Sequence, residues 1–106
     1  MASAYRRYEF LLPLKFNDGS PVPDELIGQT LVELRARFGA ASSETQVIQG
    51  HWEHLGQVYR DELVRIFVDV PDDEGNRQFF VELKATLKQR FDQLDIWMTA
   101  HAIDVL

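Results

Sequence analysis

Residues 45–70, TQVIQGHWEHLGQVYRDELVRIFVDV, decide the fold because they predict one long β-hairpin. The first arm follows the two-residue period of a strand, which places Gly50 and Trp52 on one face. Residues 54–57 supply the turn. One face of the return arm is β-branched, with Val64, Ile66, Val68 and Val70. The other face carries Leu63, Arg65, Phe67 and Asp69. A β-branched face fits a packed strand, so we expect the return arm near the centre of a sheet.

A further strand is predicted upstream of the hairpin, at Tyr8–Phe16. Every second residue is large and apolar, namely Tyr8, Phe10, Leu12, Leu14 and Phe16. Pro13 conflicts with a regular strand, because proline has no N–H to donate to a neighbouring strand. We therefore expect a bulge or incomplete pairing at Pro13.

Two amphipathic helices complete the pattern. The first has Asp24 as its expected N-cap, Gly39 as its stop, and a solvent-side pair of Glu33 with Arg37. Its apolar stripe consists of Ile27, Leu31, Leu34 and Phe38. The second helix follows the acidic turn 71–76, and its stripe consists of Phe80, Leu83, Leu87 and Phe91.

A last strand is predicted at Ile96–Val105, and the segment 40–44 is expected to be a loop. The order is then strand, helix, strand, strand, helix, strand. This order is typical of an α+β, ferredoxin-like βαββαβ sandwich, with a four-stranded antiparallel sheet and two helices on one face. The strands at 8–16 and 63–70 would be central. A chain of 106 residues predicts a single domain, 1–106.

Composition narrows the classes of partner and compartment. Seventeen acidic against eleven basic residues give a formal charge of −6, which disfavours nucleic acid as a partner. No cysteine is present, so disulfides and thiolate metal sites are excluded. The apolar runs are too short for a signal peptide or a membrane span. We expect a soluble cytoplasmic protein without a membrane partner or a cofactor.

Several short motifs carry a family resemblance. They are the P-L pair Pro13–Leu14, the D-G turn Asp18–Gly19, Pro21 and Pro23, the F-G pair Phe38–Gly39, Gly50 and Trp52 of G-x-W, and Asp61. With these motifs the chain resembles a group of short uncharacterised bacterial proteins. The resemblance implies a bacterial source and a ferredoxin-like fold. It transfers no catalytic residue.

Three histidines, His51, His54 and His101, suggest a metal site. Residues three apart on a strand point to opposite faces, so His51 and His54 would converge only where the strand bends into the turn. The sequence specifies no zinc geometry, and we predict no metal site.

The sheet face away from the helices is predicted to be apolar. It would carry Leu11, Val47, Phe67 and either Trp97 or Ile103, interspersed with Arg65, His51 and His101. A small monomer rarely exposes an apolar surface of this size, so we expect a second subunit or a ligand to bury it. We favour a homodimer interface over a small-molecule cleft with Arg65, Phe67 and Trp97 as ligand contacts. A single-stranded RNA platform could use Phe67, but its glycine and aromatic signature is absent.

An enzyme is the alternative to an interaction or ligand-binding domain. It would be a small dimeric α/β-barrel-type enzyme, a cofactor-free oxygenase or an isomerase, that acts on an aromatic or anionic small molecule. His51 or His101 would transfer the proton and Arg65 would hold a substrate oxygen. Such an enzyme requires one sheltered pocket that contains both Arg65 and a histidine.

Overall fold

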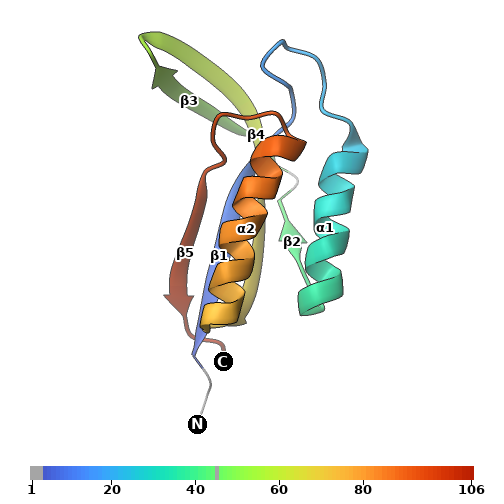
Figure 1. Cartoon of the computed structure of the whole chain (residues 1–106), viewed down its shortest axis with the longest axis vertical. Helices are drawn as coiled ribbons and strands as arrows, with labels where there is room; N and C mark the ends of the chain where they lie inside the picture. Colours follow the sequence, from blue (N-terminus) through green and yellow to red (C-terminus); the bar gives the residue numbers. More distant parts are fainter. Residues whose placement is uncertain (1–3, 45) are drawn as a thin grey trace.

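The computed structural model describes residues 4–44 and 46–106 and has two helices and a five-stranded antiparallel sheet. The elements are β1 (Tyr5–Pro13), α1 (Asp24–Phe38), β2 (Ser42–Ser43), β3 (Ile48–His54), β4 (Gln57–Pro71), α2 (Glu74–Arg90) and β5 (Met98–Ile103). Both helices lie against the same face of the sheet (Figure 1). The predicted α+β class and the placement of both helices on one face are confirmed.

The strand order is β2-β4-β1-β5, with β3 also paired to β4. The two predicted central strands, β1 and β4, are therefore central. The prediction of four strands is wrong by one, because the expected loop 40–44 contains β2, which pairs with Phe67 and Ile66 of β4. The predicted hairpin begins at Thr45, which lies outside the described residues, and its described arms are β3 and β4.

The core lies between the helices and the predicted apolar faces of β1 and β4. Its buried residues from the sheet are Tyr8, Phe10, Leu12, Ile66, Val68 and Val70. The helices contribute Leu34, Phe80, Leu83 and Leu87, with Phe91 directly after α2. Ile27, Leu31 and Phe38 of α1 pack against this core while partly exposed. Both predicted helix stripes are thus confirmed.

Pro13 is the last residue of β1. The observed strand therefore begins and ends earlier than the predicted strand Tyr8–Phe16. Alternate amides of β1 point to opposite neighbours: Leu11 donates to Trp97 before β5, and Leu14 donates to Glu62 of β4. The nitrogen of Pro13 therefore faces the β5 side, beyond the point where pairing with β5 ends. Proline costs the sheet no hydrogen bond there, and no bulge is needed.

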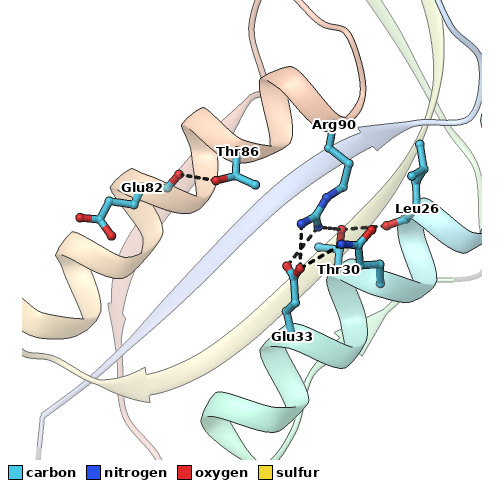
Figure 2. A network of polar contacts seen from close by, with 7 residues as sticks. Leu26, Thr30, Glu33, Glu82, Thr86 and Arg90 are labelled. Atoms are coloured by element: carbon cyan, nitrogen blue, oxygen red, sulfur yellow. Dashed lines mark hydrogen bonds and ion pairs between the residues drawn. The ribbon is translucent and has the colours of Figure 1, made fainter.

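The ends and surface of α1 differ from expectation. Pro23 is the N-cap, without a side-chain hydrogen bond, and Asp24 is already in the first turn. Gly39 has φ 83°, which confirms the left-handed stop. Glu33 does not pair with Arg37. It accepts two hydrogen bonds from Arg90 of α2, as Figure 2 shows.

The last strand is shorter than predicted, and its inward face is now defined. Met98 and Ala100 pack against the core, whereas Trp97, Thr99 and His101 are exposed. Within the described residues, no helix has the length and apolar character needed to cross a membrane.

Candidate functional site

The hairpin of β3 and β4 extends beyond the rest of the sheet (Figure 1). The central strand β1 pairs with β4 only from Leu63 to Pro71, so Gln57–Glu62 has β3 as its sheet partner. A pocket of about 360 Å³ lies where this hairpin meets the end of β1 and the connection between α2 and β5. It is lined by Leu11, Pro13, Gly50, His51, Trp52, Asp61, Leu63, Gln93, Asp95, Ile96 and Trp97.

Gly50 gives the pocket its floor. It pairs with Asp61 across the hairpin, and a Cβ at position 50 would lie 2.8 Å from Cδ1 of Leu63. The missing side chain therefore lets Leu63 lie across β3. The G of the G-x-W motif is needed for this close approach, which is a packing role.

Trp52 and Asp61 form one polar wall of the pocket. The indole Nε1 of Trp52 donates to Oδ2 of Asp61 at 2.6 Å, diagonally across the two strands. The indole also stacks on the ring of Tyr59, with centroids 4.4 Å apart and an interplanar angle of 15°. Two contacts thus fix the orientation of Trp52, and one of them also fixes Asp61.

The opposite wall comes from the connection after α2. Asp95 accepts a hydrogen bond from the backbone N–H of Ile96 and forms an ion pair with Lys84 at 3.2 Å. The Trp97 side chain is 67% exposed and lies in the pocket lining with Asp95. The lining thus has two carboxylates and two indoles, and no lysine or arginine.

The half-buried Asp61 has no basic side chain within ion-pair distance in the described part of the chain. Its one described side-chain partner is the neutral indole of Trp52. A carboxylate in this position places negative charge at the side of an apolar hollow. The pocket is therefore suited to a positively charged group.

Of the predicted site residues, the structure places Trp97 and His51 in this pocket and Arg65 and His101 elsewhere. Arg65 is bracketed by two carboxylates, Glu9 at 3.7 Å and Glu44 at 3.4 Å. His101 of β5 pairs with Arg7 and follows Trp97 by four residues, which is about 13 Å along an extended chain. The predicted catalytic combination of Arg65 with a histidine is thus not assembled in this pocket.

Phe67 lies on the predicted open face of β4, but a cation covers its ring. The guanidinium carbon of Arg7 is 4.6 Å from the ring centroid. Arg7 is itself held by Asp69 through hydrogen bonds of 2.7 and 3.0 Å. The face is therefore less apolar around Phe67 than the sequence suggested, and its apolar part is concentrated at Leu11, Leu63 and Trp97.

Sequence reasoning did not identify Trp52, Asp61 or Asp95 as site residues. The signal was present for the first two, because Gly50, Trp52 and Asp61 belong to the motif of the family resemblance. What was missing is the register, which pairs Gly50 with Asp61. Among residues 4–44 and 46–106, no three His, Asp or Glu side chains are grouped closely enough to hold a metal ion.

Comparison with known proteins identifies the fold and no family. No family model matches the chain, and no curated protein matches it in sequence. Among solved structures, the chain is similar to a phage SAM lyase in complex with S-methyl-5'-thioadenosine, with a TM-score of 0.66, 16% identity, and coverage of 99% of this chain and 92% of that one. The apo state of a phage SAM lyase matches with a TM-score of 0.60, 18% identity, and coverage of 99% and 93%.

A second kind of protein has the same arrangement. CutA from Synechococcus elongatus PCC7942 matches with a TM-score of 0.62 and 9% identity, and the match covers 96% of this chain and 79% of CutA. Identities this low establish a shared fold. The chain is a small α+β protein whose helices and sheet are arranged as in these structures.

Proposed function

We propose that this protein is a small-ligand-binding protein and that its pocket beneath the β3–β4 hairpin takes an organic cation that carries a flat aromatic ring. One observation carries the proposal. The half-buried carboxylate of Asp61 lies beside the indole of Trp52 in a mostly apolar hollow, with Trp97 also in the lining. No lysine or arginine in the lining neutralises it.

Two physical effects favour such a ligand. The face of an indole attracts a cation electrostatically, and tryptophan does so more strongly than the other aromatic residues. A carboxylate in a partly desolvated position attracts the same charge more strongly than it would in water. An anionic ligand would meet the carboxylate of Asp61, which has no ion pair among the described residues, so the predicted anionic substrate is not supported at this pocket.

The similarity to the phage SAM lyase suggests a chemical class within this description. That protein was solved with S-methyl-5'-thioadenosine, a neutral nucleoside with a flat adenine ring and a methyl thioether. We propose that the pocket here takes an adenine nucleoside whose sulfur is methylated to a sulfonium. The adenine would stack on an indole, and the sulfonium would lie beside Asp61.

Nuclear magnetic resonance tests this proposal directly, because the chain has two tryptophans and both line the pocket. We expect S-adenosylmethionine to shift the indole N–H signals of Trp52 and Trp97 in a saturable titration. Phenyltrimethylammonium should shift the same signals more weakly. Unchanged indole signals at millimolar concentrations of both compounds would sink the proposal.

A homodimer through the open sheet face is the second candidate, as the sequence suggested. The observation that favours it is the apolar cluster of Leu11, Leu63 and Trp97, in which Trp97 is 67% exposed. Sedimentation velocity should then give a dimer mass, and Trp97→Asp, which puts a charge into this apolar cluster, should shift it to a monomer. A wild-type monomer at micromolar concentration contradicts the dimer. The bacterial source and the cytoplasmic location remain predictions.

A further inference from the structure

A second hollow, of about 300 Å³, lies between α2 and β5 on the helix side of the sheet. Apolar and aromatic side chains line most of it, namely Tyr8, Phe80, Val81, Met98 and Ala100. The remaining lining residues are three cations, Arg6, Arg77 and Lys84. The chain has a formal charge of −6, whereas the charged residues that line this groove are all basic.

The helix supplies cations at both ends of the groove. Arg77, Val81 and Lys84 follow one another at spacings of four and three residues, so they share one face of α2. Arg77 and Lys84 are about 10 Å apart along the helix axis. Val81 lies between them and is 57% exposed. An apolar stretch therefore separates the two cations.

The three cations differ in how far they are already neutralised. Arg6 donates to Asp72 from Nε at 3.1 Å and from Nη2 at 3.3 Å. Lys84 forms its ion pair with Asp95 at 3.2 Å. Arg77 has no ion pair among the described residues. Arg77 is therefore the cation left for a ligand.

Tyr8, one of the residues that line the groove, carries a buried polar atom without a partner among residues 4–44 and 46–106. Tyr8 is 4% exposed, its ring stacks on Phe80 at 4.0 Å, and its hydroxyl is buried without a hydrogen bond. Buried polar atoms almost always have a partner. Burial raises the pKa of Tyr8, so the hydroxyl stays protonated and is a donor at neutral pH. The charged groups that act on it are Arg6, Arg77, Asp72 and Asp73.

We propose that this groove binds a small organic anion with an apolar body, such as an aryl carboxylate. The body would lie on Met98, Ala100 and Val81. The carboxylate would lie at the Arg77 end, where Arg6 and the Tyr8 hydroxyl can also donate to it. This site is separate from the pocket beneath the hairpin and opposite to it in charge, so the inference stands independently of the proposed function.

Titration of the ¹⁵N-labelled full chain with benzoate tests the inference. We expect saturable shifts of the backbone amides of Ala100, Met98 and Val81. Arg77→Gln should weaken benzoate binding about tenfold or more, because it removes a charge-assisted hydrogen bond. Arg35→Gln, an exposed arginine of α1, is the matched control and should bind as the wild type. Inorganic phosphate should bind more weakly than benzoate, because it has no apolar body.

Tyr8→Phe separates a ligand role from a structural role. The hydroxyl has no partner among the described residues, so its removal should leave the unfolding midpoint unchanged or raise it. The same change should weaken benzoate binding several-fold. The inference is overturned if benzoate leaves the groove amides unshifted at millimolar concentration. Equal benzoate affinities for Arg77→Gln and the wild type, or for Tyr8→Phe and the wild type, would also overturn it.

Discussion

Arg90 of α2 holds Glu33 of α1 through two parallel hydrogen bonds, 2.7 Å from Nη2 to Oε1 and 3.0 Å from Nη1 to Oε2. The same Nη1 donates to the hydroxyl of Thr30 at 2.8 Å, and that hydroxyl donates to the carbonyl of Leu26. Figure 2 shows this chain of contacts between the two helices. The side chain of Arg90 is only 11% exposed, so this pair is better shielded from water than an ordinary surface ion pair.

Replacing Arg90 should therefore destabilise the protein measurably. We expect Arg90→Ala to lower the unfolding free energy by about 1–3 kcal/mol, because hydrogen bonds to charged groups are lost and the Thr30 hydroxyl loses a donor. The exposure of Glu33, 38%, keeps the loss below that of a fully buried pair. Urea denaturation measures the change. Arg35→Ala on α1 is the control, expected within about 0.5 kcal/mol of the wild type. Equal midpoints for Arg90→Ala and the control would contradict this account.

Trp52 should contribute less to stability than a core aromatic residue. A buried tryptophan would cost about 3–5 kcal/mol on replacement by alanine. Trp52 is only half-buried and lies on the projecting hairpin, so we expect Trp52→Ala to cost about 1 kcal/mol. Phe80→Ala, at a core residue that is 1% exposed, should cost about 3–5 kcal/mol. Denaturation curves of both variants make the comparison. A similar loss of unfolding free energy in Trp52→Ala and Phe80→Ala would instead place Trp52 in the core.

The hairpin turn contains a residue, Leu55, whose replacement should stabilise the protein. Leu55 has φ 50° and Gly56 has φ 78°, so both occupy the left-handed region that a type I′ turn requires. Leucine is disfavoured there, and Leu55 is 92% exposed. Leu55→Asn should raise the unfolding free energy by about 1 kcal/mol. Val58→Asn, exposed on the adjacent strand, is the control and should give no gain. A lower midpoint for Leu55→Asn would contradict the turn geometry.

The pair of Arg7 and Asp69 should make stability fall in acid. Hydrogen bonds from Arg7 lower the pKa of Asp69 in the folded protein, against a smaller opposing effect of burial. A lowered folded pKa means that the pair stabilises the protein above the unfolded pKa of about 3.9 and stops doing so as the pH falls through the folded pKa. At pH 7, Asp69→Asn should therefore have a lower free energy of unfolding than the wild type. Between about pH 5 and 2, its free energy of unfolding should fall by less than that of the wild type. Urea denaturation at several pH values measures this. Arg7→Gln should give the same flattening, and a wild-type slope in both variants would contradict it.

Much of the fold could be predicted from residue periodicity. The alternation of β1 and β4 and the stripes of both helices follow directly from burial on one face. Two errors have physical causes. Glu33 has Arg37 one turn away, but the buried face of α2 brings Arg90 closer, and tertiary contact replaced the local pair. The two-residue strand β2 is made of serines, which carry no strand pattern, and depends on the free edge of β4.

The candidate site was less accessible to sequence reasoning, because it depends on register. Trp97 was identified by its exposure on the open face, and His51 by its residue type. Asp61 was recognised only as a residue of the motifs that carry the family resemblance. Its contact with Trp52 arises only when Gly50 stands opposite Asp61. No periodicity encodes that pairing, although the turn at Leu55–Gly56 fixes it once the turn type is known.

The central claim is that Asp61 makes the pocket selective for a positive charge. Isothermal titration with two matched nucleosides tests it: S-methyl-5'-thioadenosine, which is neutral, and its S-methylated dimethylsulfonium form. Asp61→Asn keeps an acceptor for the Trp52 indole and removes the charge, and Glu53→Gln on the exposed side of β3 is the control. We predict that the wild type and Glu53→Gln bind the sulfonium at least about tenfold more tightly than the thioether, and that Asp61→Asn loses most of this preference while keeping the smaller part that the indoles supply. Equal affinities of the wild type for the two nucleosides, or undiminished selectivity in Asp61→Asn, would contradict the claim.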